Sequence, residues 1–357
     1  MTTTEKQPTP HATRIGLWGA PQSGKTTFLA ALQIAIVNQS NDDGWLITGV
    51  DDAASDFLST STSHMNRDRI FPNATSANDV HELRWRFVRP TRGGTGRTWW
   101  RRPGHATSGQ AVFEVQLLDV SGDMFASTRT PNDLAGPAAS LFAEDEDELD
   151  IFDEPGPKFD TADPQNQTKG LLDHLATCDG IVYLFDPFRE RDSYEYFQRT
   201  LEQLARRSYE TGRLRDGRLP HHLAVCVTKF DDPAVFRKAH NYGVVLTGDD
   251  RAMTPTVPDD LAGEFFRKLC SGPNGASSLL VMRSIEQYFH TQRVNYFVSS
   301  AVGFYIGATG VFQRRDFTNV ETTPDGDLRI RGQVTPINVL EPFLWLEKQI
   351  RQSLPRT

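Results

Sequence analysis

A glycine-rich segment near the N-terminus carries the residue types that bind phosphate groups. The segment GAPQSGKT, residues 19–26, fits the pattern G-x-x-x-x-G-K-[ST], with Gly19, Gly24, Lys25 and Thr26 in its four fixed positions. Glycines let successive backbone N–H groups turn toward an anion, Lys25 can reach β- and γ-phosphates, and the Thr26 hydroxyl can ligate Mg²⁺. The predicted phosphate-contacting set is completed by Gln22, Ser23 and Thr27.

The segments on either side supply the structure that such a loop needs. Apolar residues at Ile15 and at 17–18 are typical of a buried strand, and the spacing of Phe28, Leu32 and Ile36 is typical of a helix. A loop between a strand and a helix N-terminus directs its N–H groups and the positive end of the helix dipole at one place. The order strand, loop, helix therefore favours a phosphate site over a chance match in a turn.

An aspartate ends a second apolar strand, in the segment VFEVQLLDVSGD. Asp119 closes this strand, and a carboxylate beside a phosphate loop can hold Mg²⁺ directly or through water. Gly122 follows in the loop, where its backbone N–H can approach a γ-phosphate. Val120 stands where many ATPases have a glutamate, which argues against an ATPase of the AAA type.

Two later segments predict how a base is chosen. The strand LAVCVTKFDD ends in Thr228, Lys229 and Asp231, and the strand NYFVSSAVG is followed by Ser300 and Ala301. A carboxylate at Asp231 can accept guanine N1–H and N2–H, whereas adenine offers neither donor on that edge and would leave polar groups unpaired. The Lys229 stem would cover the base plane, and a backbone N–H of the Ser-Ala pair would donate to guanine O6.

Taken in order, GAPQSGKT, DVSG, TKFD and SSA resemble the motifs of Ras-like P-loop GTPases of the translation-factor-related (TRAFAC) class. The resemblance implies a GTP-binding regulatory protein that hydrolyses GTP to GDP and phosphate with Mg²⁺ and changes the order of its switch loops, at residues 52–75 and 121–136. It also implies a switch threonine as a Mg²⁺ ligand, and Thr75 has that position, in competition with Ser76. The stretches RIFPNATS and TPINVLEPFLWLEKQI resemble, more narrowly, bacterial double-GTPase-type proteins found near prokaryotic conflict systems.

Two residues depart from the Ras-like pattern. Asp123 stands where a glutamine usually orients the attacking water. With Lys25 and Asp123 as the catalytic residues, we expect hydrolysis to be slow or to depend on a partner. Pro21 replaces a loop glycine and removes one N–H donor. Two alternatives stay open: a nucleotide-gated scaffold (a pseudo-GTPase) without turnover, and an ATP-binding P-loop NTPase.

The rest of the chain predicts an α/β protein, with a three-layer αβα P-loop NTPase fold. Strands alternate with helical patterns, which is typical of a mostly parallel sheet. The strands are expected at 14–18, 83–88, 111–118, 180–185, 223–228 and 294–299. The second and third of these have no helix between them, so they predict one antiparallel hairpin pair in a mixed sheet. Further helices are expected at 192–209, 258–270, 276–291 and 342–353.

Irregular composition divides a single GTPase domain, residues 13–354, from a short disordered leader, residues 1–12. Four segments rich in charge, glycine or proline read as insertions, at about 90–110, 140–170, 239–258 and 307–335. The last contains TPDGDLRI, whose Asp-Gly pair is a hairpin signal.

Composition excludes some function classes. A net charge of −8 argues against a general nucleic-acid binder, and three well-separated cysteines are typical of a reducing compartment. With neither a long apolar run nor an apolar leader in the sequence, we expect a cytoplasmic protein with no membrane span.

The predicted hairpin is rich in arginine and tryptophan, so an unknown protein effector could dock at its tip. Stacking of nucleic acid bases on the hairpin tip is the weaker alternative. For Trp85 itself, the simplest prediction is that its side chain faces a helix.

Overall fold

The computed structural model describes residues 13–20, 23–38, 44–72, 81–89, 111–119, 164–188, 190–271 and 276–353. Its main strands are β1 (Thr13–Gly19), β2 (Leu46–Gly49), β3 (His81–Arg89), β4 (Ala111–Asp119), β5 (Gly180–Phe185), β6 (His222–Val227) and β9 (Val294–Val298). Its helices are α1 (Lys25–Asn38), α2 (Asp52–Ser63), α3 (Pro164–Thr177), α4 (Glu190–Glu210), α5 (Pro233–Asn241), α6 (Asp259–Cys270), α7 (Ala276–Tyr288) and α8 (Glu341–Ser353). Shorter elements are η1 (His64–Asp68), η5 (Thr291–Arg293) and the strand pairs β7 (Leu246–Thr247) with β8 (Pro255–Thr256) and β10 (Val320–Thr322) with β11 (Leu328–Ile330).

The seven main strands form one mixed sheet in the order β2-β3-β4-β1-β5-β6-β9. The neighbouring pairs β4–β1, β1–β5, β5–β6 and β6–β9 are parallel, whereas β2–β3 and β3–β4 are antiparallel. The α/β class, the mostly parallel sheet and the antiparallel hairpin pair are thus confirmed. Because the central strands are parallel, their carboxyl ends meet at one edge of the sheet, which is where ligands bind in open α/β folds.

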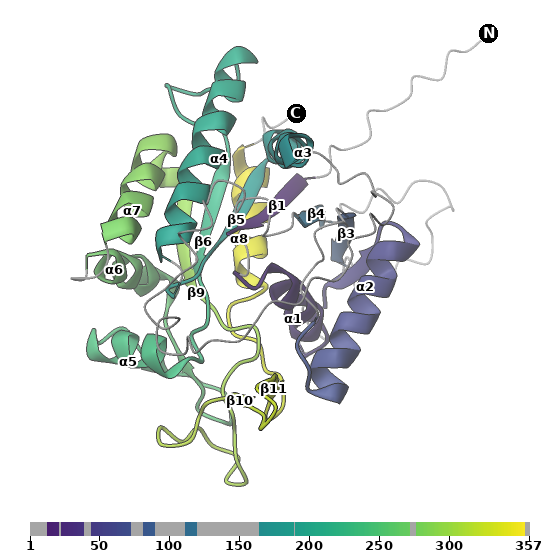
Figure 1. Ribbon diagram of the computed structural model, residues 1–357, viewed down its shortest axis with the longest axis vertical. Coiled ribbons are helices and arrows are strands. Elements are labelled where there is room, and N and C mark those ends of the chain that lie inside the picture. Colours follow the sequence, from purple (N-terminus) through teal and green to yellow (C-terminus); the bar gives the residue numbers. More distant parts are fainter. Residues whose placement is uncertain are drawn as a thin grey trace, which may run out of the picture.

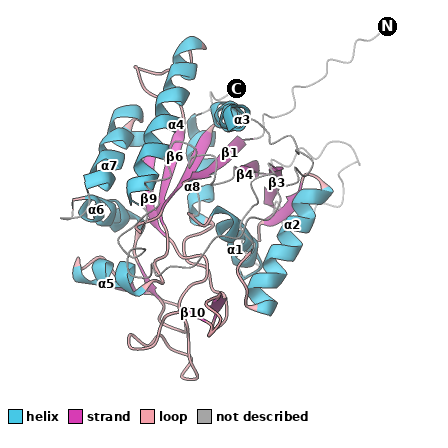
Figure 2. Cartoon of the chain, in the orientation of Figure 1, coloured by secondary structure: helices cyan, strands magenta, loops and turns pink. Residues whose placement is uncertain are grey.

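Alternating side chains divide the core into two layers, one on each face of the sheet. In β5, Ile181 and Tyr183 join a core layer with α3, α4, α6 and α7, while Val182 and Leu184 join α1, α2 and α8 on the other face. Figure 1 shows α4, α6 and α7 together on one side of the strands, and Figure 2 shows the same helix, sheet, helix arrangement. Sheets buried on both faces read as continuous apolar runs, as GIVYLF does in β5.

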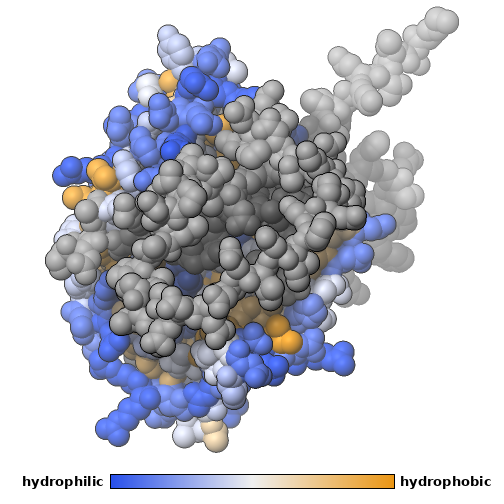
Figure 3. Space-filling model, viewed as in Figure 1, coloured by the Kyte–Doolittle hydropathy of each residue, from blue (hydrophilic) through white to orange (hydrophobic). Residues whose placement is uncertain are grey.

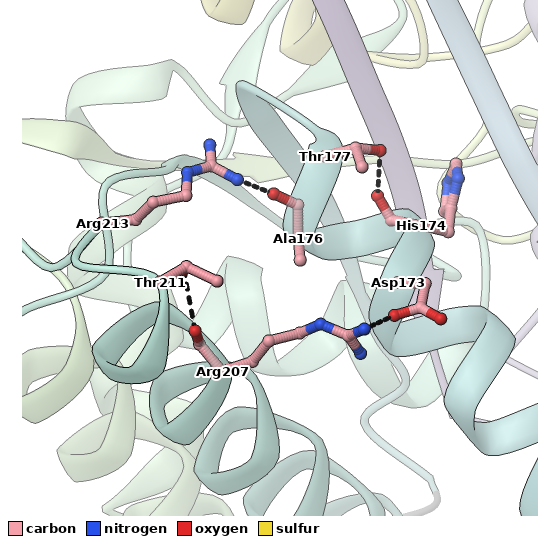
Figure 4. A network of polar contacts seen from close by, with 7 residues as sticks. All are labelled: Asp173, His174, Ala176, Thr177, Arg207, Thr211 and Arg213. Carbon is pink, nitrogen blue, oxygen red and sulfur yellow. Dashed lines mark hydrogen bonds and ion pairs between the residues drawn. The ribbon is translucent and has the colours of Figure 1, made fainter.

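Helix α3 is fastened to α4 at its C-terminal end. The Arg207 guanidinium pairs with Asp173, and Arg213 donates to the carbonyl oxygen of Ala176 (Figure 4). A guanidinium that hydrogen-bonds one of the last carbonyls of a helix satisfies an acceptor that lacks a partner within the helix. These contacts hold α3 beside α4, with which it shares a core layer.

Several elements differ from the sequence prediction. Residues 52–63, assigned to a switch loop, form α2, because Asp51 caps the helix by accepting from Ala54 N–H at 2.8 Å. Helix α3 begins at Pro164, inside the expected insertion at 140–170. Helix α5 begins at Pro233 after the capping residue Asp232 and was not predicted. The expected hairpin within 307–335 is present as β10 and β11.

The hairpin strands show what Trp85 does. Its ring is fully buried, and Nε1 donates to the carbonyl oxygen of Ala54 in α2 at 2.9 Å, so the prediction that it faces a helix is confirmed. Arg86 pairs with Glu114 on the neighbouring strand at 2.8 Å. The hairpin tip, residues 90–110, lies outside the described residues, as do residues 1–12. In Figure 3 hydrophilic side chains predominate among the coloured residues of the visible face.

Candidate nucleotide site

The strand register brings the ends of the four strands that carry the sequence motifs to one edge of the sheet. Gly19 at the end of β1 pairs with Leu184 near the end of β5, and Val227 at the end of β6 pairs with Phe185 and with Val298. Strands β1 and β4 pair with a constant offset, up to Gly16 with Gln116. The same offset continued along both strands sets the end of β4 level with the end of β1. The carboxyl ends of these strands therefore lie along the same edge of the sheet.

The predicted phosphate loop joins β1 to α1, and Ser23 N–H donates to Ala20 O at 3.1 Å within its described part. Gly24 has φ +89°, a left-handed conformation that favours glycine, and its carbonyl oxygen accepts from Phe28 N–H at 2.8 Å in the first helical turn. Gly19 has no room for a side chain, since a Cβ there would lie 2.6 Å from Ser23 Oγ and 3.1 Å from Leu184. Glycine is thus required at both ends of the loop.

Lys25 folds back over this loop from the N-terminus of α1. Its Nζ lies 3.3 Å from the carbonyl oxygens of Gly19 and Ala20, so the ammonium sits above the start of the loop. Thr26 and Thr27 follow in the first turn and are partly exposed, whereas Ser23 is buried. An ammonium and a helix N-terminus at one place suit a polyphosphate.

The residues expected around Mg²⁺ are only partly described. Asp119 ends β4, where its backbone pairs with His81 of β3, and the strand offset sets it level with Gly19. Thr75 lies outside the described residues, and so do Gln22, Gly122 and Asp123. Among the residues that the structure describes, His, Cys, Asp and Glu form no group of three or more that could hold a metal. Thr26, Thr75 and Asp119 remain the predicted ligands.

The second loop, Thr228 to Asp231, is braced from both sides. Thr228 donates to Phe185 O through its N–H (3.0 Å) and its hydroxyl (3.1 Å), which continues the pairing with β5. Phe230 is buried, and its N–H donates to Ser299 O at 3.1 Å beyond β9. Lys229 lies between them with φ +61°, so the chain turns sharply and sends its side chain outward.

Asp231 is a buried carboxylate joined to the third loop. Ser300 Oγ donates to Asp231 Oδ1 at 2.5 Å, and Ser300 Oγ itself accepts from Gly303 N–H at 2.7 Å. Burial raises the pKa of Asp231 to about 6, against the lowering effects of the Ser300 hydrogen bond and of Lys229. A carboxylate held in a dry place with spare acceptor capacity suits a ligand with N–H donors.

The third loop specifies which N–H could meet guanine O6. Ser300 N–H already donates to Ile337 O at 3.0 Å. Ala301 is partly exposed, whereas Val302 turns into the core. Of the predicted Ser-Ala pair, Ala301 is therefore the better placed to donate to a base oxygen, while Ser300 orients Asp231.

One residue of the site was missed by sequence reasoning. Asp186 directly follows β5, is fully buried, and pairs with Lys229 Nζ at 2.7 Å. Its second oxygen accepts from Phe188 N–H at 3.0 Å, and the half-exposed Phe188 ring lies 5.6 Å from Lys229 Nζ. The signal was in the sequence, since YLFD is an apolar strand ending in aspartate, as QLLD is at Asp119.

Comparisons with known proteins give weak similarities. No protein-family profile and no curated protein matches the chain. Solved structures that it resembles include sup35 complexed with GDP, with a TM-score of 0.27 and 11% identity over 84% of this chain and 40% of that one. Another is sup35 complexed with GMPPNP (TM-score 0.27, 12% identity, 84% of this chain, 41% of that one). The signal recognition particle receptor SRb-GTP/SRX complex from Chaetomium thermophilum has a TM-score of 0.30 at 13% identity, over 83% of this chain and 96% of that one.

The chain spans about two fifths of the length of the sup35 structures it matches. At these TM-scores the likenesses decide nothing about function, which must be inferred from the strand order and loops of the chain itself. Along the described parts of the chain, no helix is both long and apolar enough to cross a membrane.

Proposed function

We propose that the chain binds GTP with Mg²⁺ at the carboxyl edge of its sheet. The observation that carries the proposal is the buried Asp231 carboxylate, held by Ser300 in a loop that opens on the same side as the phosphate loop. Lys25 would exchange its contacts to loop carbonyls for phosphate oxygens, and Asp231 would accept the N1–H and N2–H of guanine. Thr26, Thr75 and Asp119 would hold the metal, which would neutralise charge on the phosphates.

We further propose slow hydrolysis to GDP and phosphate, with control of a partner protein. Asp123 in place of a water-orienting glutamine, and Pro21 in the phosphate loop, support a low intrinsic rate. We also propose that the partner is a protein effector and that the chain is related to bacterial double-GTPase-type proteins. The support for this relationship is the sequence resemblance. A scaffold that binds GTP without turnover is the contrasting function.

Competition between GTP and ATP for a fluorescent guanine nucleotide tests the binding step. We expect GTP, and not ATP, to displace the probe from the wild-type protein, and we expect Lys25→Ala to lose binding of the probe itself. Equal displacement by both triphosphates would contradict guanine binding. Phosphate release in a single turnover then separates a slow enzyme from a scaffold, because a scaffold leaves GTP intact over hours.

A further inference from the structure

The loop that follows β9 is fixed by a segment that returns alongside it. Ser300 N–H donates to Ile337 O at 3.0 Å, and Ile337 N–H donates back to Ser300 O at 2.9 Å. Thr335 N–H donates to Val302 O at 3.1 Å. The returning segment therefore holds the backbone on both sides of Ala301, the residue that would face guanine O6.

A buried asparagine makes the second attachment to this loop. Asn319 is fully buried, and its Nδ2 donates to Val302 O at 3.0 Å and to Gln333 O at 3.1 Å. Its Oδ1 accepts from Gly332 N–H at 2.7 Å. One amide thus uses both donors and its acceptor to join the loop after β9 to the backbone after β11.

An arginine from the other end of the chain makes the third attachment. Arg69, just after η1, donates from its guanidinium to Gly332 O, and its own carbonyl oxygen accepts from Ile330 N–H at 2.9 Å. Ile70 and Arg329 form an antiparallel bridge beside it. Arg69 has φ +61°, a left-handed conformation uncommon for arginine. The backbone of Arg69 is therefore bonded to β11, and its side chain is bonded to the segment after β11.

These contacts form a continuous path from Arg69 through Gly332 and Asn319 to Val302. In Figure 1, β10 and β11 lie between α5 and the lower end of α2, and the bridge between Ile70 and Arg329 joins β11 to the segment after η1. Apolar packing runs along the same path, since Ile330 and Val302 are buried in one core layer.

We propose that Asn319 and Arg69 are positioning residues for base recognition, which hold Ala301 N–H at the place where guanine O6 binds. The inference rests on the proposed function, because it assigns how the same site reads one atom of the base. Asn319 acts through Val302 O, one residue from Ala301, and Arg69 acts through Gly332 and Asn319. Asp231 reads the opposite side of the same edge and is held separately by Ser300.

Two nucleotide analogues, each altered at one position of the base, separate recognition of O6 from recognition of the 2-amino group. 6-Thio-GTP replaces O6 by sulfur, a weaker acceptor, whereas ITP lacks the 2-amino group that Asp231 would bind. Asn319→Asp keeps the shape and the acceptor but sets carboxylate oxygens against Val302 O and Gln333 O. We expect this variant to lower the GTP/6-thio-GTP affinity ratio about three- to ten-fold, the effect of losing one hydrogen bond, and to leave the GTP/ITP ratio within about two-fold.

A purely structural role would weaken GTP, 6-thio-GTP and ITP by the same factor, and that result would overturn the inference. Arg69→Asn covers the case in which Asn319→Asp does not fold, because asparagine tolerates a left-handed backbone but cannot reach Gly332. It should lower the GTP/6-thio-GTP ratio about two- to three-fold. Arg67→Asn is the matched control, since this highly exposed side chain, 3.9 Å from Asp68, should leave the ratio unchanged.

Equal ratios in the Arg69→Asn and Arg67→Asn proteins would also overturn the inference. Failure of the wild-type protein to bind GTP at all is a different outcome, which would contradict the proposed function and with it this inference.

Discussion

The ammonium of Lys229 lies 2.7 Å from Oδ2 of Asp186, a carboxylate with no exposed surface, while the lysine side chain is 42% exposed. A buried carboxylate needs a partner, so this contact fixes the direction of the Lys229 side chain. The pair ties the loop after β6 to the end of β5.

Removing the lysine should destabilise the protein. Lys229→Asn keeps a residue that tolerates the left-handed backbone but leaves Asp186 without its cation, and we expect a loss of about 1–3 kcal/mol in the free energy of unfolding, measured with denaturant. The exposed pair of Lys268 and Glu264, also 2.7 Å apart, provides the control. Lys268→Asn should change stability little. Equal losses in the two variants would show that Asp186 does not depend on Lys229.

Lys25→Ala should abolish tight binding of triphosphate. The substitution removes the mobile cation of the phosphate loop and leaves the backbone donors, so GTP affinity should fall by about ten- to a hundred-fold or more in a titration calorimeter. Lys348→Ala, an exposed lysine on α8, should bind GTP as the wild type does. Near-native GTP affinity in a folded Lys25→Ala protein would refute the phosphate-loop assignment.

Guanine affinity should depend on pH through Asp231. Its pKa is raised to about 6 by burial, so without nucleotide the carboxyl takes up a proton as pH falls through about 6 and can no longer accept two donors. GDP affinity should therefore fall by up to about ten-fold per pH unit below 6. Asp231→Asn removes this group while leaving the titration of the GDP phosphate, so the difference between the two proteins isolates it. Parallel pH profiles for the two proteins would contradict the assignment.

The raised pKa of Asp231 also determines the direction in which its contribution to stability changes with pH. The unfolded carboxyl titrates near its ordinary value, so between about 4 and 6 the folded state binds more protons than the unfolded state. Asp231 therefore lowers stability as pH rises through this window and has no further effect above it. Asp231→Asn should remove that contribution.

Gly303 is required by a close crossing of two backbone segments. It has φ +70°, and a Cβ would lie 1.9 Å from Thr335 O. Gly303→Ala should therefore cost about 2–5 kcal/mol from strain and overlap together. Gly326→Ala, at φ +88° with open space around it, should cost only about 1–2 kcal/mol for the backbone conformation. Similar midpoints for the two variants in thermal unfolding would show that the crossing can relax.

Local patterns predicted the sheet most clearly at β5 and β6, which are apolar runs followed by a polar residue, Asp186 or Thr228. The motif residues Gly24, Lys25, Asp231 and Ser300 come to one edge for the same reason, since parallel strands align their carboxyl ends. Helix α2 escaped prediction because its apolar side is sparse, and its position depends on the Asp51 cap and on Trp85 from a distant strand. Asn319 and Arg69 could not be predicted, because their contacts join segments with no local signal.

The most direct test of guanine recognition is the affinity of Asp231→Asn for GTP and XTP. Xanthine carries an oxygen where guanine has its amino group, so the carboxylate should repel it while an amide could donate to it. We predict that GTP affinity falls and XTP affinity rises, by about 1–3 kcal/mol each. Misfolding would weaken both nucleotides together. An Asp231→Asn protein that binds GTP as before, or that loses GTP without gaining XTP, would contradict guanine recognition by this chain.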